Sequence, residues 1–299
     1  MTYKSGFVGI IGRPNVGKST FLNSVLGEKI AITSNKPQTT RNTIRGVYTN
    51  EEEQVIFIDT PGIHKPKNKL GTYMTEMALR TLDEVDVILL IVDNRADFGP
   101  GDSYILEALQ KVKTPKILII NKIDLIHPDQ YATIYYNYEK LGLFDKIYGA
   151  EATSGKNIDA ILKGIQEYIP EGPMLFPADM ITDQQERFLI SEIIREKTLM
   201  YLEDEVPHGI AVGILSIKED KELLSIQAEI YCEKKSHKGI IIGKEGRKLK
   251  GIGKSARMEI ESLLGIKVFL ELWIKVKPNW RENELNLKDL GYKLGNTDI

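Results

Sequence analysis

The sequence has 299 residues, of which 42% are hydrophobic and 27% are charged, and its formal net charge is −2. These values indicate a globular protein of about two domains, and any nucleic-acid site must come from local patches of charge. The single cysteine, Cys232, excludes an internal disulfide and a multi-cysteine metal site, and a strand-like context favours a packed thiol.

The chain carries no segment that reads as a targeting signal or a membrane span. The N-terminus lacks the charged start and apolar core of a signal peptide. The longest apolar runs, such as Val85 to Val92, are too short to cross a bilayer. We therefore expect a cytoplasmic protein.

The first motif lies between a predicted strand at 7–11 and a predicted helix at 19–26. It reads Gly12-Arg13-Pro14-Asn15-Val16-Gly17-Lys18-Ser19 and fits the phosphate-binding loop G-x-x-x-x-G-K-[ST]. The backbone N–H groups of this loop and the N-terminus of the following helix favour the binding of a phosphate group. We include the next residue, Thr20, in the site. Lys18 supplies charge to the outer phosphates, and Ser19 offers a hydroxyl to Mg²⁺.

The polar stretch 33–42 follows, and its lack of apolar periodicity predicts a mobile loop. A loop threonine after a P-loop can close on Mg²⁺ and the γ-phosphate. Thr39 and Thr40 are both candidates, and we favour Thr40. The alternative is an ordinary polar loop.

Two further predicted strands, 43–48 and 54–58, lead into Asp59-Thr60-Pro61-Gly62. Ligands of open α/β sheets bind at the carboxyl ends of the strands, so Asp59 is placed to hold the magnesium shell. The N–H of Gly62 would contact the γ-phosphate, with Ile63 next to it. A second mobile segment, 64–71, and a helix at about 72–82 complete this region.

The continuous apolar run 85–93 predicts a central parallel strand, and a helix at 103–111 and a strand at 116–120 follow. The last strand ends in Asn121-Lys122-Ile123-Asp124. The Asp124 carboxylate can accept from both N1–H and the N2 amine of guanine, and adenine offers neither in that arrangement. Asn121 would brace the neighbouring loop and Lys122 would lie along the purine, although a common polar turn has the same composition.

Together these motifs predict a guanine-nucleotide domain over 1–172. They occur in one order, each at the end of a predicted strand, and the domain closes with a strand at 147–150, a turn at 153–155 and an amphipathic helix. The apolar face of that helix carries Ile158, Ile161, Leu162, Ile165 and Ile169.

The motifs resemble those of the translation-factor-related GTPases, and Pro37-Gln38-Thr39-Thr40-Arg41 narrows the resemblance to the Era family. It implies a P-loop NTPase-type α/β fold, with a mixed, mostly parallel sheet and helices on both faces. It also implies GTP/GDP and Mg²⁺ binding. The fifth motif departs from the usual Ser-Ala, because Ala150-Glu151-Ala152 stands there, so only backbone contacts near Ala152 would reach the guanine O6.

Hydrolysis would depend on position and charge neutralisation by Lys18, Thr40, Asp59 and Gly62. Many relatives place a water-orienting glutamine directly after D-x-x-G, and here that residue is Ile63. We therefore expect slow turnover, on the order of 10⁻⁴ to 10⁻² per second. Asn15 resembles an asparagine that holds K⁺ in related enzymes, and the alternative is that it only shapes the turn.

Three prolines and a glycine within 169–177 predict a semi-rigid linker, which we place at 173–182. The region 183–299 then shows the order helix, strand, strand, helix, helix, strand, beginning with an amphipathic helix at 184–202 and ending with a strand at 267–276. With Gly243-Lys244-Glu245-Gly246 between its last two helices, it resembles a bacterial-type (type II, α+β) KH domain. Such a loop can lie against the sugar-phosphate backbone of single-stranded RNA.

The charge around this loop supports RNA binding. Between Lys234 and Lys277 there are twelve basic and four acidic residues. Helical spacing puts Arg247, Lys250, Lys254 and Arg257 on one stripe, and Leu249, Ile252, Ala256, Ile260 and Leu263 on a stripe facing the core. A solvated basic face is the alternative.

The tail from Trp280 to Leu294 is predicted to form a short packed helix, with Trp280 either stacking on a base or, as we favour, anchoring the core. The resemblance implies a GTPase that binds the 3′ end of 16S ribosomal RNA in assembly of the small ribosomal subunit. We also expect a monomer without a DNA partner. Two alternatives stay open. One is an RNA-holding assembly placeholder with structural GTP, and the other is a cell-cycle regulator held peripherally on the inner face of the membrane.

Overall fold

The computed structural model describes residues 2–36, 38–95, 97–204 and 206–292 of the chain. These residues form two units, with the main division between Asp183 and Gln184. Each unit contains its own sheet.

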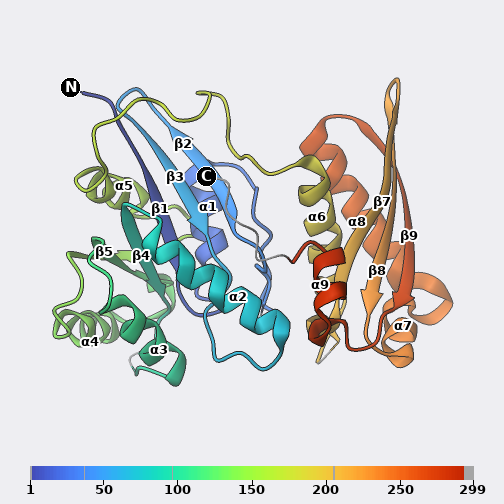
Figure 1. Cartoon of the computed structure of the whole chain (residues 1–299), viewed down its shortest axis with the longest axis horizontal. Coiled ribbons are helices and arrows are strands. Elements are labelled where there is room, and N and C mark those ends of the chain that lie inside the picture. Colours follow the sequence, from blue (N-terminus) through green and yellow to red (C-terminus); the bar gives the residue numbers. More distant parts are fainter. Residues whose placement is uncertain (1, 37, 96, 205, 293–299) are drawn as a thin grey trace. The chain divides into compact units, whose positions relative to one another are not determined.

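The first unit is built on a six-stranded sheet in the order β2-β3-β1-β4-β5-β6 (Figure 1). The strands are β1 (Lys4–Ile11), β2 (Ile44–Thr49), β3 (Glu53–Asp59), β4 (Val87–Val92), β5 (Lys116–Asn121) and β6 (Lys146–Ala150). Every neighbouring pair is parallel except β2 and β3, which form an antiparallel hairpin. The sheet is therefore mixed and mostly parallel, as the sequence predicts.

Helices cover both faces of this sheet, which explains why β3, β4 and β5 consist of buried residues. The helices are α1 (Lys18–Leu26), α2 (Lys69–Arg80), α3 (Pro100–Leu109), α4 (Pro128–Glu139) and α5 (Ile158–Gln166). Residues of α2, α3 and α4 share one hydrophobic core with β4 and β5, while α1 lies on the opposite face (Figure 1). Helices α2 and α3 each begin three residues before their predicted starts, and α4 was not predicted from the sequence.

The segment predicted as a linker, 173–182, contains no helix or strand and lies along the first unit. The amide oxygen of Gln54 accepts hydrogen bonds from the backbone N–H groups of Leu175 and Phe176. The Thr182 hydroxyl donates to the carbonyl oxygen of Arg45 at 2.6 Å. Side chains and backbone of the β2–β3 hairpin therefore hold this segment.

The second unit packs helices on one face of a three-stranded sheet in the order β7-β8-β9. Its elements are α6 (Glu186–Met200), β7 (Ala211–Asp220), β8 (Leu223–Cys232), α7 (Lys235–Ile242), α8 (Arg247–Leu264), β9 (Lys267–Val276) and α9 (Glu284–Asp289). Strands β7 and β8 are antiparallel, and β9 is parallel to β8. This is the predicted order of a KH domain.

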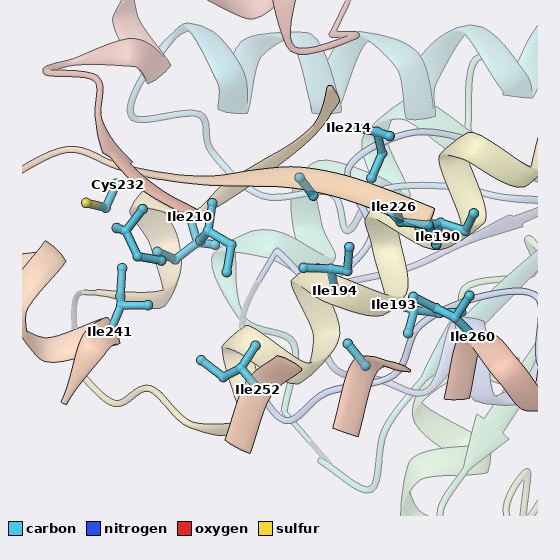
Figure 2. Close-up of a cluster of buried hydrophobic side chains, with 14 of the residues drawn as sticks. Ile190, Ile193, Ile194, Ile210, Ile214, Ile226, Cys232, Ile241, Ile252 and Ile260 are labelled. Carbon is cyan, nitrogen blue, oxygen red and sulfur yellow. The ribbon is translucent and has the colours of Figure 1, made fainter. Parts of the chain in front are cut away.

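Alternating apolar residues on β8 and β9 face α6 and α8, and together they form the core of this unit. Figure 2 shows isoleucines of α6, the sheet and α8 pointing toward one another, with Cys232 at one end. Ile252, Ala256 and Ile260 of α8 are buried as predicted, whereas Leu263 is 40% exposed, because it lies in the last turn of the helix.

The prediction that Trp280 anchors the core is confirmed, and the alternative that its ring stacks on a base is wrong. The indole is fully buried, and its Nε1 donates to the carbonyl oxygen of Gly209 at 2.9 Å. Tyr292 stacks on it with a centroid separation of 5.9 Å. Leu294, the last residue of the predicted helix, lies outside the described residues.

Candidate functional site

The loop between β1 and α1 has a backbone that only glycine accommodates at two points. Gly12 and Gly17 have φ angles of +154° and +103°. A Cβ on Gly12 would lie 2.3 Å from the carbonyl oxygen of Ile91, and one on Gly17 would lie 2.2 Å from Asn121 Nδ2. Neither contact is sterically allowed. Residues of β4 and β5 therefore pack so closely against the loop that only glycine fits at these two positions.

Lys18 begins α1 and is buried. Its ammonium donates to the carbonyl oxygens of Arg13 (3.0 Å) and Gly12 (3.4 Å) within the same loop. Burial lowers the pKa of Lys18 to about 8, and the negative charge of Asp59 opposes this shift. The side chain is a desolvated cation held by the backbone of the P-loop, which suits a phosphate chain.

Three oxygen-bearing side chains meet at the start of α1. Ser19 Oγ donates to Asp59 Oδ2 at 2.6 Å and lies 2.8 Å from Thr40 Oγ1. Burial raises the pKa of Asp59 to about 6, although the charge of Lys18 and the hydrogen bond from Ser19 lower it. Asp59 Oδ1 is buried and has no hydrogen-bond partner among the described residues. A hard cation such as Mg²⁺ suits these oxygens, so the residues fit the metal.

The segment after β3 lies directly on the P-loop. A Cβ on Gly62 would be 2.7 Å from backbone atoms of Pro14, and the N–H of Ile63 donates to the carbonyl oxygen of Gly12 at 3.0 Å. The Thr60 hydroxyl donates to Ile10, and Pro61 is buried beside it. Close packing therefore places the Gly62 amide next to the P-loop.

The residues predicted to contact guanine lie at the ends of β5 and β6. Asn121 Nδ2 donates to the carbonyl oxygen of Val16 at 2.9 Å, and its Oδ1 accepts from the N–H of Ala152 at 3.1 Å. Lys122 Nζ donates to the carbonyl oxygen of Asn15. Asn121 thus joins three loops, while Asp124 is exposed on a 3-10 turn that includes Ile123.

The surroundings of Arg13 were not predicted from the sequence. The guanidinium lies 2.8 Å from Asp93 Oδ1 and 2.7 Å from Asp102 Oδ1, with side-chain exposure of 15% or less in all three residues. Gly101 leaves room for it, because a Cβ there would lie 3.2 Å from Arg13 Cδ. This ion-pair cluster ties the P-loop to the end of β4 and the start of α3. No local pattern signals these contacts across eighty or more residues.

In the second unit, the G-x-x-G loop joins α7 to α8 with three residues at positive φ. These are Gly243 (71°), Glu245 (54°) and Gly246 (75°). Lys244, Glu245 and Arg247 are exposed, and Arg247 pairs with Glu245 at 2.8 Å. This ion pair directs the carboxylate toward Arg247 and reduces its repulsion of an incoming phosphate.

An open groove of about 560 Å³ runs between α8 and β9. Lys250, Lys254 and Arg257 supply its basic side, and its other lining residues are Leu249, Gly253, Val268, Phe269, Leu270 and Leu272. Of the basic stripe, only Arg247 is not part of the lining. Cationic side chains over an apolar floor suit a nucleic-acid strand whose phosphates and bases need different surroundings.

The described residues contain neither a further metal cluster nor a membrane-spanning helix. Within 2–36, 38–95, 97–204 and 206–292, no cluster of three or more histidine, cysteine or acidic residues could bind a metal. In the same part of the chain, none of the helices has the length and apolar character that crossing a bilayer requires.

The fold and these sites define a P-loop GTPase domain followed by a KH domain. The family model described as 50S ribosome-binding GTPase matches residues 7–122, and the KH domain model matches residues 205–281. GTPase Era of Alkaliphilus metalliredigens is 59% identical over 98% of this chain and 100% of that protein. GTPase Era of Clostridioides difficile is 58% identical over 97% and 99%, respectively. The chain belongs to the Era family of GTPases.

Two solved structures are similar over nearly the whole chain. One is Era in complex with MgGDPNP and nucleotides 1506–1542 of 16S ribosomal RNA, with 44% identity, a TM-score of 0.94 and coverage of 98% of this chain and 100% of that one. The other is a tyrosine-to-alanine variant of Aquifex aeolicus Era bound to GDP.AlF4⁻, with the same identity and TM-score and coverage of 97% and 100%.

Proposed function

We propose that the protein binds and hydrolyses GTP in its first unit and binds the 3′ end of 16S ribosomal RNA in its second, in assembly of the small ribosomal subunit. The contacts of Ser19 with Thr40 and Asp59 beside the P-loop support GTP binding and hydrolysis most directly. The basic groove supports the second. The Era structure with MgGDPNP and 16S ribosomal RNA carries both kinds of ligand, and its likeness to this chain supports the combination.

In this proposal Ser19, Thr40 and Asp59 hold Mg²⁺, which neutralises charge on the phosphates when bound. We assign this role to Thr40 rather than Thr39, because the Thr40 hydroxyl lies at Ser19. Lys18 and the P-loop amides neutralise further charge, and the Gly62 N–H contacts the γ-phosphate. The remaining nucleotide contacts come from 12–20, 59–63, 121–124 and Ala152.

Asn15 has two interpretations, a K⁺ ligand or a turn residue, and its positive φ of 65° agrees with the turn. The rates of GTP hydrolysis in matched Na⁺ and K⁺ buffers separate them. A rate that rises in K⁺ and does so less in Asn15→Ala supports the ion. Equal rates leave only the turn.

The RNA site is proposed as Gly243–Arg247 together with Lys250, Lys254 and Arg257. A Lys250→Ala/Lys254→Ala double variant should weaken binding of the 16S 3′-terminal fragment. It should also flatten the plot of log affinity against log salt concentration by about 1.4, at about 0.7 per lost single-strand phosphate contact. Lys163→Ala, an exposed lysine on α5, is the control. An unchanged salt slope would count against this site.

If the protein is instead an RNA-holding placeholder with structural GTP, its role in assembly does not require GTP hydrolysis. Lys18→Ala should abolish GTP hydrolysis and, under the proposal, small-subunit maturation as well. Maturation that continues without GTP binding would favour the placeholder. A monomer, a cytoplasmic location and the absence of a DNA partner complete the proposal. Peripheral membrane contact stays an alternative, which co-sedimentation with anionic vesicles tests.

A further inference from the structure

Ile63 stands where many GTPases carry the glutamine that orients the attacking water. Its side chain is fully buried in the core shared by α2, α3 and β4, and it has no hydrogen-bonding group. Ile63 therefore cannot supply an acceptor for this water.

The neighbouring His64 makes two contacts that together determine its tautomer. Its Nδ1 lies 3.1 Å from the carbonyl oxygen of Gly62, and its Nε2 lies 3.1 Å from Gln38 Nε2. A carbonyl oxygen can only accept, so Nδ1 carries the proton in the neutral ring. Nε2 then has a lone pair and accepts from the Gln38 amide NH₂ group.

This contact also determines which way the Gln38 amide is turned. With its nitrogen on His64, the oxygen Oε1 points away from the ring, where it is buried without a hydrogen-bond partner in the described part of the chain. A buried acceptor without a partner costs free energy, unless a donor such as water reaches it. Gln38 therefore offers the same group as the glutamine that Ile63 replaces.

Position in the chain indicates where this acceptor acts. Gln38 precedes Thr40 by two residues, and His64 follows Gly62 by two. The pair thus joins the two segments that flank the proposed γ-phosphate site. The surroundings restrain both residues, because Thr75 Oγ1 donates to the His64 carbonyl oxygen and Arg41 Nε donates to that of Gln38. Gln38 itself holds a positive φ of 60°, a costly conformation of the kind found at functional sites.

We propose that Gln38 is the catalytic residue that orients the attacking water through its amide oxygen, and that His64 is the positioning residue that sets the amide. This rests on the proposed GTP hydrolysis. In the step, the water oxygen bonds to the γ-phosphorus while the bond from phosphorus to the β–γ bridging oxygen breaks, and its electron pair leaves with GDP. The water proton passes to the released phosphate, so Gln38 gains and loses nothing.

Single-turnover hydrolysis by the full chain tests the proposal. Gln38→Ala should lower the rate by about tenfold or more, with GDP affinity and melting temperature unchanged. His64→Ala should lower it less, the double variant should match Gln38→Ala, and His64→Gln, which restores an acceptor, should recover part of the loss. Gln110→Ala, an exposed glutamine at the end of α3, is the control.

A wild-type protein that does not hydrolyse GTP would overturn the proposed function itself. Normal turnover in both Gln38→Ala and His64→Ala would overturn only this inference. The same holds if the loss of rate in the double variant equals the product of the losses in the two single variants. If Gln38 acts in the transition state, Gln38→Ala should also bind GDP with aluminium fluoride at least tenfold more weakly, at equal affinity for GDP. An equal loss for both ligands would contradict that role.

A measurement on the wild type alone avoids any effect of the variants on folding. The ¹⁵N chemical shifts of the His64 ring should report a proton on Nδ1 and a hydrogen-bonded lone pair on Nε2. A proton on Nε2 in the neutral ring would require Gln38 to present its oxygen to His64, which would overturn the inference.

Discussion

Among single residues, Asp59 carries a charge that the fold disfavours. Burial raises its pKa from 3.8 to about 6, so the folded state holds the proton more tightly than the unfolded state does. The free energy of unfolding should therefore fall by about 2 kcal/mol from this group as the pH rises from about 4 to 6. Lys18, whose pKa is about 8, stays charged throughout that interval.

Urea unfolding of nucleotide-free, Mg²⁺-free protein at pH 4 to 7 measures this effect. Asp59→Asn has no titrating group, so its stability relative to wild type should increase across the interval. A difference between the two proteins that does not vary with pH would show that Asp59 ionises normally.

We expect Asp124 to select the base. In Asp124→Asn, the amide no longer accepts from both N1–H and the N2 amine of guanine, but it can donate to the C2 oxygen of xanthine. GTP affinity should fall by roughly 100-fold or more, and affinity for xanthosine triphosphate should rise. Calorimetric titration with both nucleotides measures the exchange. A variant that keeps its preference for GTP would place the base elsewhere.

At the scale of elements, the G-x-x-G loop should be far less tolerant of a methyl group than the helix before it. Gly243 has φ 71° and ψ 176°, and a Cβ there would lie 2.9 Å from side-chain atoms of Lys248. Gly243→Ala should therefore cost about 1–3 kcal/mol of stability. Gly239, inside α7, has no neighbouring atom within 4 Å of the position that a Cβ would take, so Gly239→Ala should stabilise by about 0.5–1 kcal/mol.

Chemical unfolding monitored by fluorescence of Trp273 and Trp280 compares these two variants in the second unit. Similar stability in both would mean that the loop is not held in the conformation described.

The residue patterns of single helices and strands explain which features could be predicted from the sequence. Asp59 and Asn121 come directly after predicted strands, and Ser19 begins the predicted helix that follows the P-loop. The carboxyl ends of parallel strands meet at one edge of the sheet, so the proximity of these residues follows from the motifs. The amphipathic pattern of α8 predicted its buried and basic faces in the same way. Helix α4 was missed, because only Ile134 and Tyr138 of its twelve residues are buried, which leaves almost no apolar period.

Contacts between loops could not be predicted, since they have no period. Gln38 and His64 are 26 residues apart in two irregular segments, and their hydrogen bond depends on loop conformation alone. Arg13 was assigned only as part of the P-loop, and its carboxylate partners lie beyond the end of β4 and within α3. Such contacts become apparent only when the fold places the segments.

In the molecule as a whole, a hydrophobic core within 11–147 and a second core within 190–276 have no residue in common. Calorimetric unfolding should therefore show two transitions. Mg²⁺ with GDP should move only the transition of the first unit to higher temperature. The free energy of unfolding of that unit should increase by about 2.7 kcal/mol when the ligand is present at 100 times its Kd. Two transitions that shift together would contradict independent cores.

We expect the first unit to turn over GTP and to select the guanine base. The most direct test is the hydrolysis of GTP and of ATP by the purified full chain with Mg²⁺, measured side by side. We expect GTP to be hydrolysed at about 10⁻⁴ to 10⁻² per second and ATP not to be hydrolysed above background. Equal hydrolysis of both nucleotides would show that the site does not select guanine, and GTP that stays bound and intact would show that the unit is not a GTPase.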